Sequence, residues 1–171
     1  GLAYLSPDRK QEGLCLEASI AENLIASHQR KPRFGKAGFL NPIAIAGYAD
    51  ERVAAFDIKC ASPQQPVGAL SGGNQQKVAM ARELYDSPRV LLACQPTRGV
   101  DIKGIAAIHQ EILAFRDAGG AVLLISEELE ELVQLSDRIV TIYGGRRTGE
   151  FPRGAAAMER IGRTMLGEVA A

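Results

Sequence analysis

The residues best suited to chemistry lie at 70–77, in the segment "LSGGNQQK". Ser71 precedes Gly72 and Gly73, and a run of helix-forming residues follows. A serine hydroxyl in this place can cap the helix, and two glycines leave the backbone N–H groups of the first turn uncovered. Because a helix N-terminus also carries partial positive charge, the pattern predicts a phosphate-binding site. For "SGG" taken alone, a plain serine cap after a glycine turn is the alternative.

Helical segments must carry this site, and apolar spacing predicts three of them in the first half of the chain, at about 19–28, 47–57 and 72–86. The first opens with Ser19 and Glu22, whose three-residue spacing is a capping-box pattern. A short apolar run at 2–5 predicts a strand before it. The segment 29–46 contains two prolines and two glycines, and it predicts an irregular loop.

The second half has a different rhythm, with apolar runs at 89–93, 121–125 and 138–143 that alternate with helical patterns at 102–117 and 127–134. Such alternation predicts parallel strands joined by crossover helices. We therefore expect residues 1–5 and 89–143 to form a parallel α/β core, with the divide from the helical part near residue 86. A short strand pair around Gly144 and Gly145 and a terminal helix near 155–166 complete the prediction.

The composition is that of a globular domain, with 171 residues, 46% hydrophobic and 23% charged. Twenty basic residues balance twenty acidic ones, so the charge indicates no nucleic-acid partner. No apolar run approaches the roughly 18 residues of a membrane span. The three cysteines lack metal-ligand spacing and are expected to be reduced thiols. Since the chain begins with a strand-like segment and no initiator Met, we expect a piece of a longer polypeptide.

The longer segment "LSGGNQQKVAMARELYDSPRVLL" resembles the signature motif, its helix and the following strand of ATP-binding-cassette (ABC) ATPases. Together with "PTRGVD", it is similar to the subgroup that energises import of simple sugars and nucleosides and carries two cassettes in one chain. "SPDRKQEGL" at 6–14 resembles the Q-loop segment of the second cassette in that subgroup. "SDRIVTIYGGRRTGEF" resembles the closing strands of a cassette, so the resemblance covers essentially the whole chain.

The resemblance implies an α/β fold: a P-loop NTPase-like ABC ATPase core, with a parallel sheet and flanking helices, plus a helical subdomain. The expected parts are a core strand and Q-loop region at 1–14, a helical subdomain with the signature motif at 15–86, and an α/β core with C-terminal strands and a helix at 87–171. The P-loop pattern G-x-x-x-x-G-K-[ST] occurs nowhere in the sequence. In the family it lies upstream of the position of residue 1, so we expect the C-terminal part of the second cassette.

In that family each ATP is held between the P-loop of one cassette and the signature motif of the other. The resemblance therefore implies that five residues contact the nucleotide of the partner cassette: Ser71, Gly72, Gly73, Asn74 and Gln75. Asp101 matches the aspartate of the D-loop, which contacts the partner cassette, and Arg98 is expected at the same junction. The structural alternatives are a helix cap at Asp101 and a solvated surface arginine at Arg98.

The cassette's own site departs from the family pattern. The family strand corresponding to 89–93 ends in Asp-Glu, where the Asp helps to hold Mg²⁺ and the Glu polarises the attacking water. Cys94 and Gln95 stand in those places. A thiol is a poor ligand for Mg²⁺, and an amide can orient water but cannot accept its proton. Gln95 is thus expected to be a degenerate base position next to ATP, and Cys94 a small buried residue at a strand end.

Two further positions agree with this departure. Glu127 stands in the place of the family's switch histidine, and Pro7 stands where the Q-loop glutamine, or the glutamate of the subgroup, would be. Ser126 is expected to cap the following helix, with Glu127 and Glu128 as acids of its first turn. We expect no metal-ligating set of residues in this chain.

The resemblance implies ATP and Mg²⁺ as cofactors of the full-length protein, with the isolated chain binding neither tightly and inactive as an ATPase. It implies as partners the other cassette of the same chain, membrane-spanning permease subunits and a solute-binding protein, at the cytoplasmic face of the membrane, and no nucleic acid. The leading hypothesis is an ATPase subunit that powers import of a simple sugar or nucleoside. A catalytically silent docking or regulatory cassette is the alternative, and a soluble ABC protein of DNA repair or translation fits the motifs less well.

Overall fold

The computed structural model describes residues 1–36 and 38–169. The chain divides by its internal contacts into two compact units, Gly1–Leu123 and Leu124–Ala171. The boundary between the two units falls within the strand Ala121–Ile125. The divide predicted near residue 86 is a different one, between a helix-rich segment and an α/β segment, and it stays a prediction.

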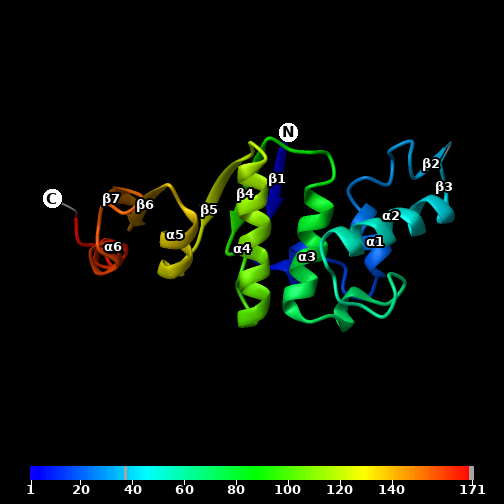
Figure 1. Cartoon of the computed structure of the whole chain (residues 1–171), viewed down its shortest axis with the longest axis horizontal. Coiled ribbons are helices and arrows are strands. Elements are labelled where there is room, and N and C mark those ends of the chain that lie inside the picture. Colours follow the sequence, from blue (N-terminus) through cyan, green and yellow to red (C-terminus); the bar gives the residue numbers. More distant parts are fainter. Residues whose placement is uncertain (37, 170–171) are drawn as a thin grey trace. The chain divides into compact units, whose positions relative to one another are not determined.

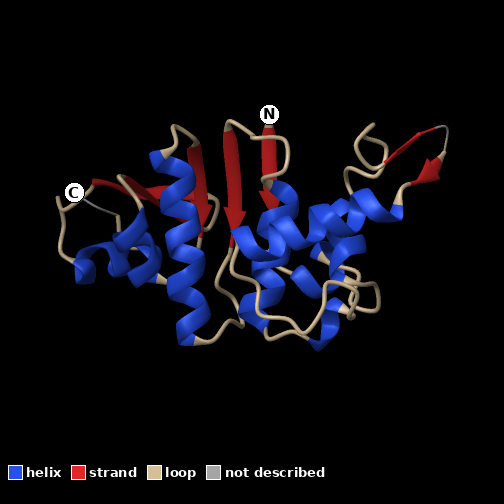
Figure 2. Ribbon diagram, turned by 45° about the vertical axis from the view of Figure 1, so that its right-hand side comes forward, coloured by secondary structure: helices blue, strands red, loops and turns tan. Residues whose placement is uncertain are grey.

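The central sheet of the chain has three strands in the order β1-β4-β5 (Figure 1). Their bounds are β1 (Leu2–Leu5), β4 (Val90–Cys94) and β5 (Ala121–Ile125). β1 and β4 are parallel, with Leu2 opposite Val90 and Leu5 opposite Ala93, and all three arrows point the same way in Figure 2. The connection from β4 to β5 runs through α4 (Ile102–Asp117), which has the bounds predicted from its apolar spacing. The parallel α/β arrangement of these three strands is therefore confirmed.

The two faces of the first two strands differ in burial, as alternating side-chain directions require. Ala3 and Leu5 of β1 are buried, whereas Leu2 is 66% exposed. In β4, Leu91 is buried and Val90 is exposed. α3 (Gly72–Glu83) packs against β1 and against α4. The inner face of the sheet is thus joined to the helix that carries the "SGG" sequence.

The helical part of the first unit contains α1 (Ile20–Ile25) and α2 (Pro42–Ala55), which pack against each other. The predicted capping box is present at the start of α1. The hydroxyl of Ser19 accepts the N–H of Glu22 at 3.1 Å, and the carboxylate of Glu22 accepts the N–H of Ser19 at 2.8 Å. This reciprocal bonding satisfies two backbone donors that the helix itself leaves unpaired.

The loop predicted at 29–46 is wrong in its second half. A short hairpin forms there from β2 (Gly35–Lys36) and β3 (Phe39–Leu40), and α2 begins at Pro42 rather than near 47. The side chain of Asn41 caps this helix by accepting the N–H groups of Ile43 and Ala44. Proline is well suited to the first helical position, where its missing N–H would be unpaired anyway, so Pro42 starts a helix rather than interrupting one.

The second unit contains α5 (Leu129–Leu135), β6 (Arg138–Tyr143), β7 (Arg146–Pro152) and α6 (Met158–Met165). β6 and β7 form an antiparallel hairpin whose turn is Gly144-Gly145, both with positive φ, as a tight hairpin turn requires. The predicted strand pair and terminal helix are therefore confirmed. The expectation that 138–143 joins the parallel sheet is wrong, because this strand pairs with β7 in a separate two-stranded sheet.

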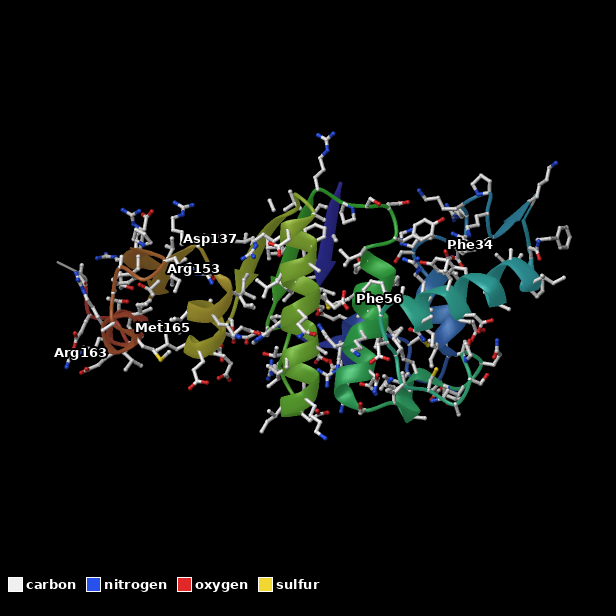
Figure 3. All side chains as sticks on the ribbon, in the orientation of Figure 1. Phe34, Phe56, Asp137, Arg153, Arg163 and Met165 are labelled. Carbon is white, nitrogen blue, oxygen red and sulfur yellow. The ribbon has the colours of Figure 1, made fainter. Side chains whose placement is uncertain are left out.

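Three apolar side chains form the core of the second unit: Ile139 of β6, Phe151 of β7 and Ile161 of α6. A chain of buried hydroxyls joins the same elements, since Thr141 donates to Thr164 at 2.9 Å and Thr148 donates to Thr141 at 3.0 Å. At the surface, Arg153 pairs with Asp137 at 3.4 Å, and Figure 3 shows the two side by side, with Arg163 and Met165 on α6. These contacts hold the hairpin and the terminal helix together.

The predicted cap at Ser126 is also corrected by the structure. α5 begins at Leu129, its capping residue is Glu128, and the side chain of Glu128 makes no capping hydrogen bond. The hydroxyl of Ser126 instead accepts the N–H of Glu128 at 3.0 Å, which closes a turn before the helix. Glu127 therefore precedes the helix and is exposed. Across residues 1–36 and 38–169, the helices are too short or too polar to cross a membrane.

An aromatic cluster joins the segment after α1 to α2 and to the end of α3. The ring of Tyr48 lies 5.0 Å from that of Phe34 and 5.4 Å from that of Tyr85. Tyr48 is only 1% exposed, and burial raises its pKa to about 12. Its hydroxyl finds no hydrogen-bond partner among the residues that the structure describes. The ring, rather than the hydroxyl, is therefore expected to stabilise this part of the fold.

We predict that Tyr48→Phe leaves the free energy of unfolding unchanged or raises it by up to about 1 kcal/mol, because the change removes an unpaired buried hydroxyl. Phe34→Ala in the same cluster is the matched comparison and should cost about 3–5 kcal/mol, because it opens a cavity. Urea unfolding followed by circular dichroism measures both. A loss above about 1 kcal/mol for Tyr48→Phe would mean that the hydroxyl makes a stabilising interaction.

Candidate functional site: the first turn of α3 and the loop before α4

The predicted cap of α3 is present. The hydroxyl of Ser71 accepts the N–H of Asn74 at 3.5 Å and the side-chain amide of Asn74 at 3.0 Å. The Oδ1 atom of Asn74 accepts the N–H of Lys59 at 2.8 Å, which ties the preceding loop to the helix. Ser71 is exposed, while the rest of the helix up to Ala81 is buried or half-buried. One serine hydroxyl thus stands at the open end of an otherwise covered helix.

The two glycines of the signature-like motif are explained by close packing. A Cβ atom added to Gly72 would lie 2.6 Å from Nη2 of Arg9 and 2.6 Å from the carbonyl oxygen of Gly99. A Cβ atom added to Gly73 would lie 3.0 Å from the Cα atom of Gly104. No side chain fits in either place without displacing backbone atoms. Packing alone therefore requires both glycines, and phosphate binding needs its own test.

The loop between β4 and α4 forms the other side of this contact. Asp101 caps α4, because its carboxylate accepts the N–H of Gly104 at 2.9 Å, as the structural alternative for this residue predicts. Gly99 has a φ of 66°, a left-handed conformation that favours glycine. Arg98 is exposed, whereas Thr97 is buried. The predicted contacts of Arg98 and Asp101 with a partner cassette remain proposals.

Arg9 joins the two sides and was not singled out from the sequence. Its guanidinium donates to the carbonyl oxygens of Arg98 and Gly99, the latter at 2.9 Å, and its Nε donates to Oε1 of Gln75 at 3.4 Å. The side chain is buried, and this burial lowers its pKa from the ordinary value. Arg9 lies in the "SPDRKQEGL" segment, but nothing in the local pattern shows that this arginine, rather than Lys10, points inward.

The side chain of Gln75 lies inside the protein, and its expected nucleotide contact stays a prediction. Its side chain is buried, its amide nitrogen donates to the carbonyl of Leu70 at 3.1 Å, and its oxygen accepts from Arg9. The side chain therefore supports the motif from inside the protein. Within the motif, Ser71 is exposed and Gly72 and Asn74 are half-buried, whereas Gly73 is buried like Gln75.

The end of β4 carries the predicted neutral pair. Cys94 is half-buried rather than fully buried, and burial raises the pKa of its thiol while a hydrogen bond with Tyr4 on the neighbouring strand opposes this rise. The thiol is therefore protonated at neutral pH. Gln95 follows with a φ of 47°, an uncommon conformation for a residue with a side chain. The strand thus ends in two uncharged groups, on a backbone that turns sharply.

These groups do not fit Mg²⁺, which prefers hard oxygen ligands and is usually bound by carboxylates. Within residues 1–36 and 38–169, no three His, Cys, Asp or Glu side chains gather in a way that could hold a metal ion. Pro7, at the expected Q-loop position, is half-buried and has no side-chain ligand atom. We therefore derive no metal-dependent step at this strand end.

No family model matches the sequence. Nucleoside import ATP-binding protein NupA of Lactococcus lactis subsp. cremoris (strain MG1363) is 39% identical over 166 residues, which cover 97% of this chain and 33% of that protein. Ribose import ATP-binding protein RbsA 2 of Rhizobium etli is 40% identical over 167 residues, which cover 98% of this chain and 33% of that protein. The chain thus spans about a third of the length of these curated relatives.

A solved structure of the ATP-binding cassette MJ0796, a dimer in a post-hydrolysis state bound to ADP and Pi, matches with a TM-score of 0.67 at 23% identity. The match covers 88% of this chain and 62% of that chain. The fold is therefore that of an ABC ATPase, with a parallel sheet and flanking helices. Within that class, the chain is homologous to nucleoside and ribose import ATP-binding proteins, so the resemblance drawn from its motifs is confirmed.

We predict that the thiol of Cys94 titrates above the ordinary cysteine value of about 8.5, because burial disfavours its thiolate. With Cys15 and Cys60 changed to serine, the rate of iodoacetamide alkylation against pH should have its midpoint above that value. Tyr4→Phe should move the midpoint further up, because it removes the hydrogen bond that lowers this pKa. Tyr143→Phe serves as the control and should leave it unchanged. A midpoint at or below about 8.5 would contradict the burial argument.

Proposed function

We propose that this chain is the C-terminal part of the second cassette of an ATPase that powers import of a simple sugar or nucleoside. We further propose that it supplies its signature motif to the ATP site built on the partner cassette. One observation carries the proposal: the exposed Ser71 caps a helix packed against the 98–101 loop, while the chain's own strand end has no acidic pair.

The first turn of α3 can bind a phosphate group in three ways. Its N–H groups face the open end of the helix, the helix dipole adds partial positive charge, and the hydroxyl of Ser71 can donate a further hydrogen bond. Asn74 orients the hydroxyl through its 3.0 Å hydrogen bond. These groups bind and orient a ligand, and none of them supplies a base.

The strand end of β4 has a different role in this proposal. Gln95 can orient water but cannot accept its proton, and the protonated thiol of Cys94 is a poor metal ligand. The site on this cassette is therefore weak, and the working site is the one completed in trans. ATP and Mg²⁺ are the cofactors of the full-length protein in this proposal.

The proposed setting is that of an importer. The partners would be the other cassette of the same chain, membrane-spanning permease subunits and a solute-binding protein, at the cytoplasmic face of the membrane. The homologues named as nucleoside and ribose import ATP-binding proteins support this setting over a soluble ABC protein of DNA repair or translation. A catalytically silent docking cassette remains the competing function, and the neutral pair at the strand end is what favours it.

We predict that Ser71→Arg in the full-length protein lowers ATP turnover roughly tenfold or more, because a bulky side chain would fill the phosphate position of the site in trans. Asn41→Arg is the matched control, since it also replaces an exposed helix cap by arginine but at α2. It should cost about 1 kcal/mol of stability and leave turnover unchanged. Equal turnover of the Ser71 variant and the wild type would favour the silent docking cassette.

A second prediction concerns the strand end. Cys94→Asp together with Gln95→Glu should raise hydrolysis at this site by about two- to tenfold, because the pair supplies hard oxygen ligands and a proton acceptor. Adding Glu127→His should raise it further, if the switch position has the role that the family resemblance implies. Steady-state assays are made in full-length protein whose other site is disabled. If protein with the wild-type Cys94 and Gln95 already hydrolyses ATP rapidly when the other site is disabled, these two residues do not impair hydrolysis.

A further inference from the structure

We propose that Arg9 is a positioning residue that holds the carbonyls of Arg98 and Gly99 against the first turn of α3. It thereby fixes the 98–101 loop and the first turn of α3 as one rigid surface, which would face the partner cassette. The inference rests on the proposed function for its effect on turnover. Its structural part, the coupling of the 98–101 loop to the signature helix, stands on contacts within this chain.

The guanidinium of Arg9 lies at the meeting point of three segments. Its two terminal nitrogens each donate to one carbonyl of the loop, at Arg98 and Gly99, and its Nε donates to Gln75 on α3. Nη2 would lie 2.6 Å from a Cβ atom on Gly72, so the guanidinium also contacts the backbone of the first helical turn. One side chain therefore touches both halves of the proposed surface.

The backbone of Arg9 is itself held in place. It begins a single π-helical turn, Arg9–Gly13, which follows β1 after the short loop 6–8. The carboxylate of Asp8 caps this turn by accepting the N–H groups of Lys10 and Gln11 at 3.1 and 3.0 Å. The hydroxyl of Ser6 donates to Glu12 at 2.6 Å across the same turn. The guanidinium is thus supported from the central sheet through a short and braced segment.

The free-energy cost of burying the guanidinium of Arg9 argues for a specific role of this side chain. Arg9 is only 9% exposed, and the charge of Asp8, the residue before it, opposes only part of the effect of burial on its pKa. A buried charge is unfavourable unless neighbouring dipoles or an opposite charge replace its hydration. Here the dipoles are the two loop carbonyls and the side-chain oxygen of Gln75. Removing the guanidinium would leave the buried side-chain oxygen of Gln75 without this donor, which is also unfavourable.

The geometry requires arginine rather than any cation. The planar guanidinium reaches two adjacent carbonyls in parallel and keeps Nε free for a third acceptor. The ammonium group of lysine is a single point and cannot span the three acceptors in the same way. If the positive charge alone held the loop, the Arg9→Lys variant would hold it as the wild type does. If the planar guanidinium with its several donors is needed, Arg9→Lys should release the loop as Arg9→Met does.

The first test is hydrogen exchange in the nucleotide-free, full-length protein, which does not depend on ATPase activity. Arg9→Met and Arg9→Lys should both raise exchange about tenfold at 71–76 and 97–105, because a loop released from charge-assisted hydrogen bonds opens more often. Residues 139–161 of the second unit should exchange as in the wild type. Lys10→Met is the matched control, since Lys10 is the exposed neighbouring cation, and it should change neither segment.

The second test is a double-mutant cycle on turnover. Arg9→Met should lower kcat, and it should add little further loss in the Ser71→Arg background, because both changes act on the same surface. Independent, additive losses would overturn the inference. So would wild-type exchange in Arg9→Lys, or a rise in exchange spread evenly over both units. If Ser71→Arg leaves turnover unchanged, the proposed function fails, while the exchange experiment still decides whether Arg9 fixes the loop.

Discussion

The close approach between the first turn of α3 and the first turn of α4 is the constraint on which the candidate site depends. A Cβ atom on Gly73 would lie 3.0 Å from Cα of Gly104, and a Cβ atom on Gly104 would lie 3.1 Å from Cα of Gly73. Two helix N-termini are therefore adjacent, although their partial positive ends repel each other. The carboxylate of Asp101 caps one of them and reduces this repulsion, and the hydroxyl of Ser71 caps the other.

The features that could be predicted from the sequence are those that depend on residues close together in the chain. The caps at Ser19, Ser71 and Asp101 depend on residues three positions apart, and all three are present. The 102–117 helix was predicted from one apolar face and has those bounds. The separation of 138–143 from the central sheet could not be predicted in this way, since alternating apolar residues suit a parallel or an antiparallel neighbour equally. Arg9 escaped notice for the same reason, because its acceptors are 66 to 90 residues away.

The signature-like motif shows why a functional and a structural explanation need not compete. Gly72 and Gly73 pack closely against Arg9, Gly99 and Gly104, in the same motif that is proposed to bind phosphate. A side chain at Gly72 would push α3 away from the 98–101 loop whether or not the motif binds a ligand. Loss of activity after a glycine change would therefore not separate the two roles. Ser71 does separate them, because it is exposed and its hydroxyl is hydrogen-bonded to Asn74 within the first turn of α3.

The neutral strand end has an energetic consequence for the free protein. A pair of carboxylates at the end of β4 would repel each other and would lose hydration in this half-buried position, unless a cation neutralised them. Cys94 and Gln95 carry no charge, so the strand end needs no ion to be stable. The guanidinium of Arg9 donates to the loop carbonyls and to Gln75. The charge of Arg9 therefore holds the 98–101 loop, and the strand end itself carries no acidic pair.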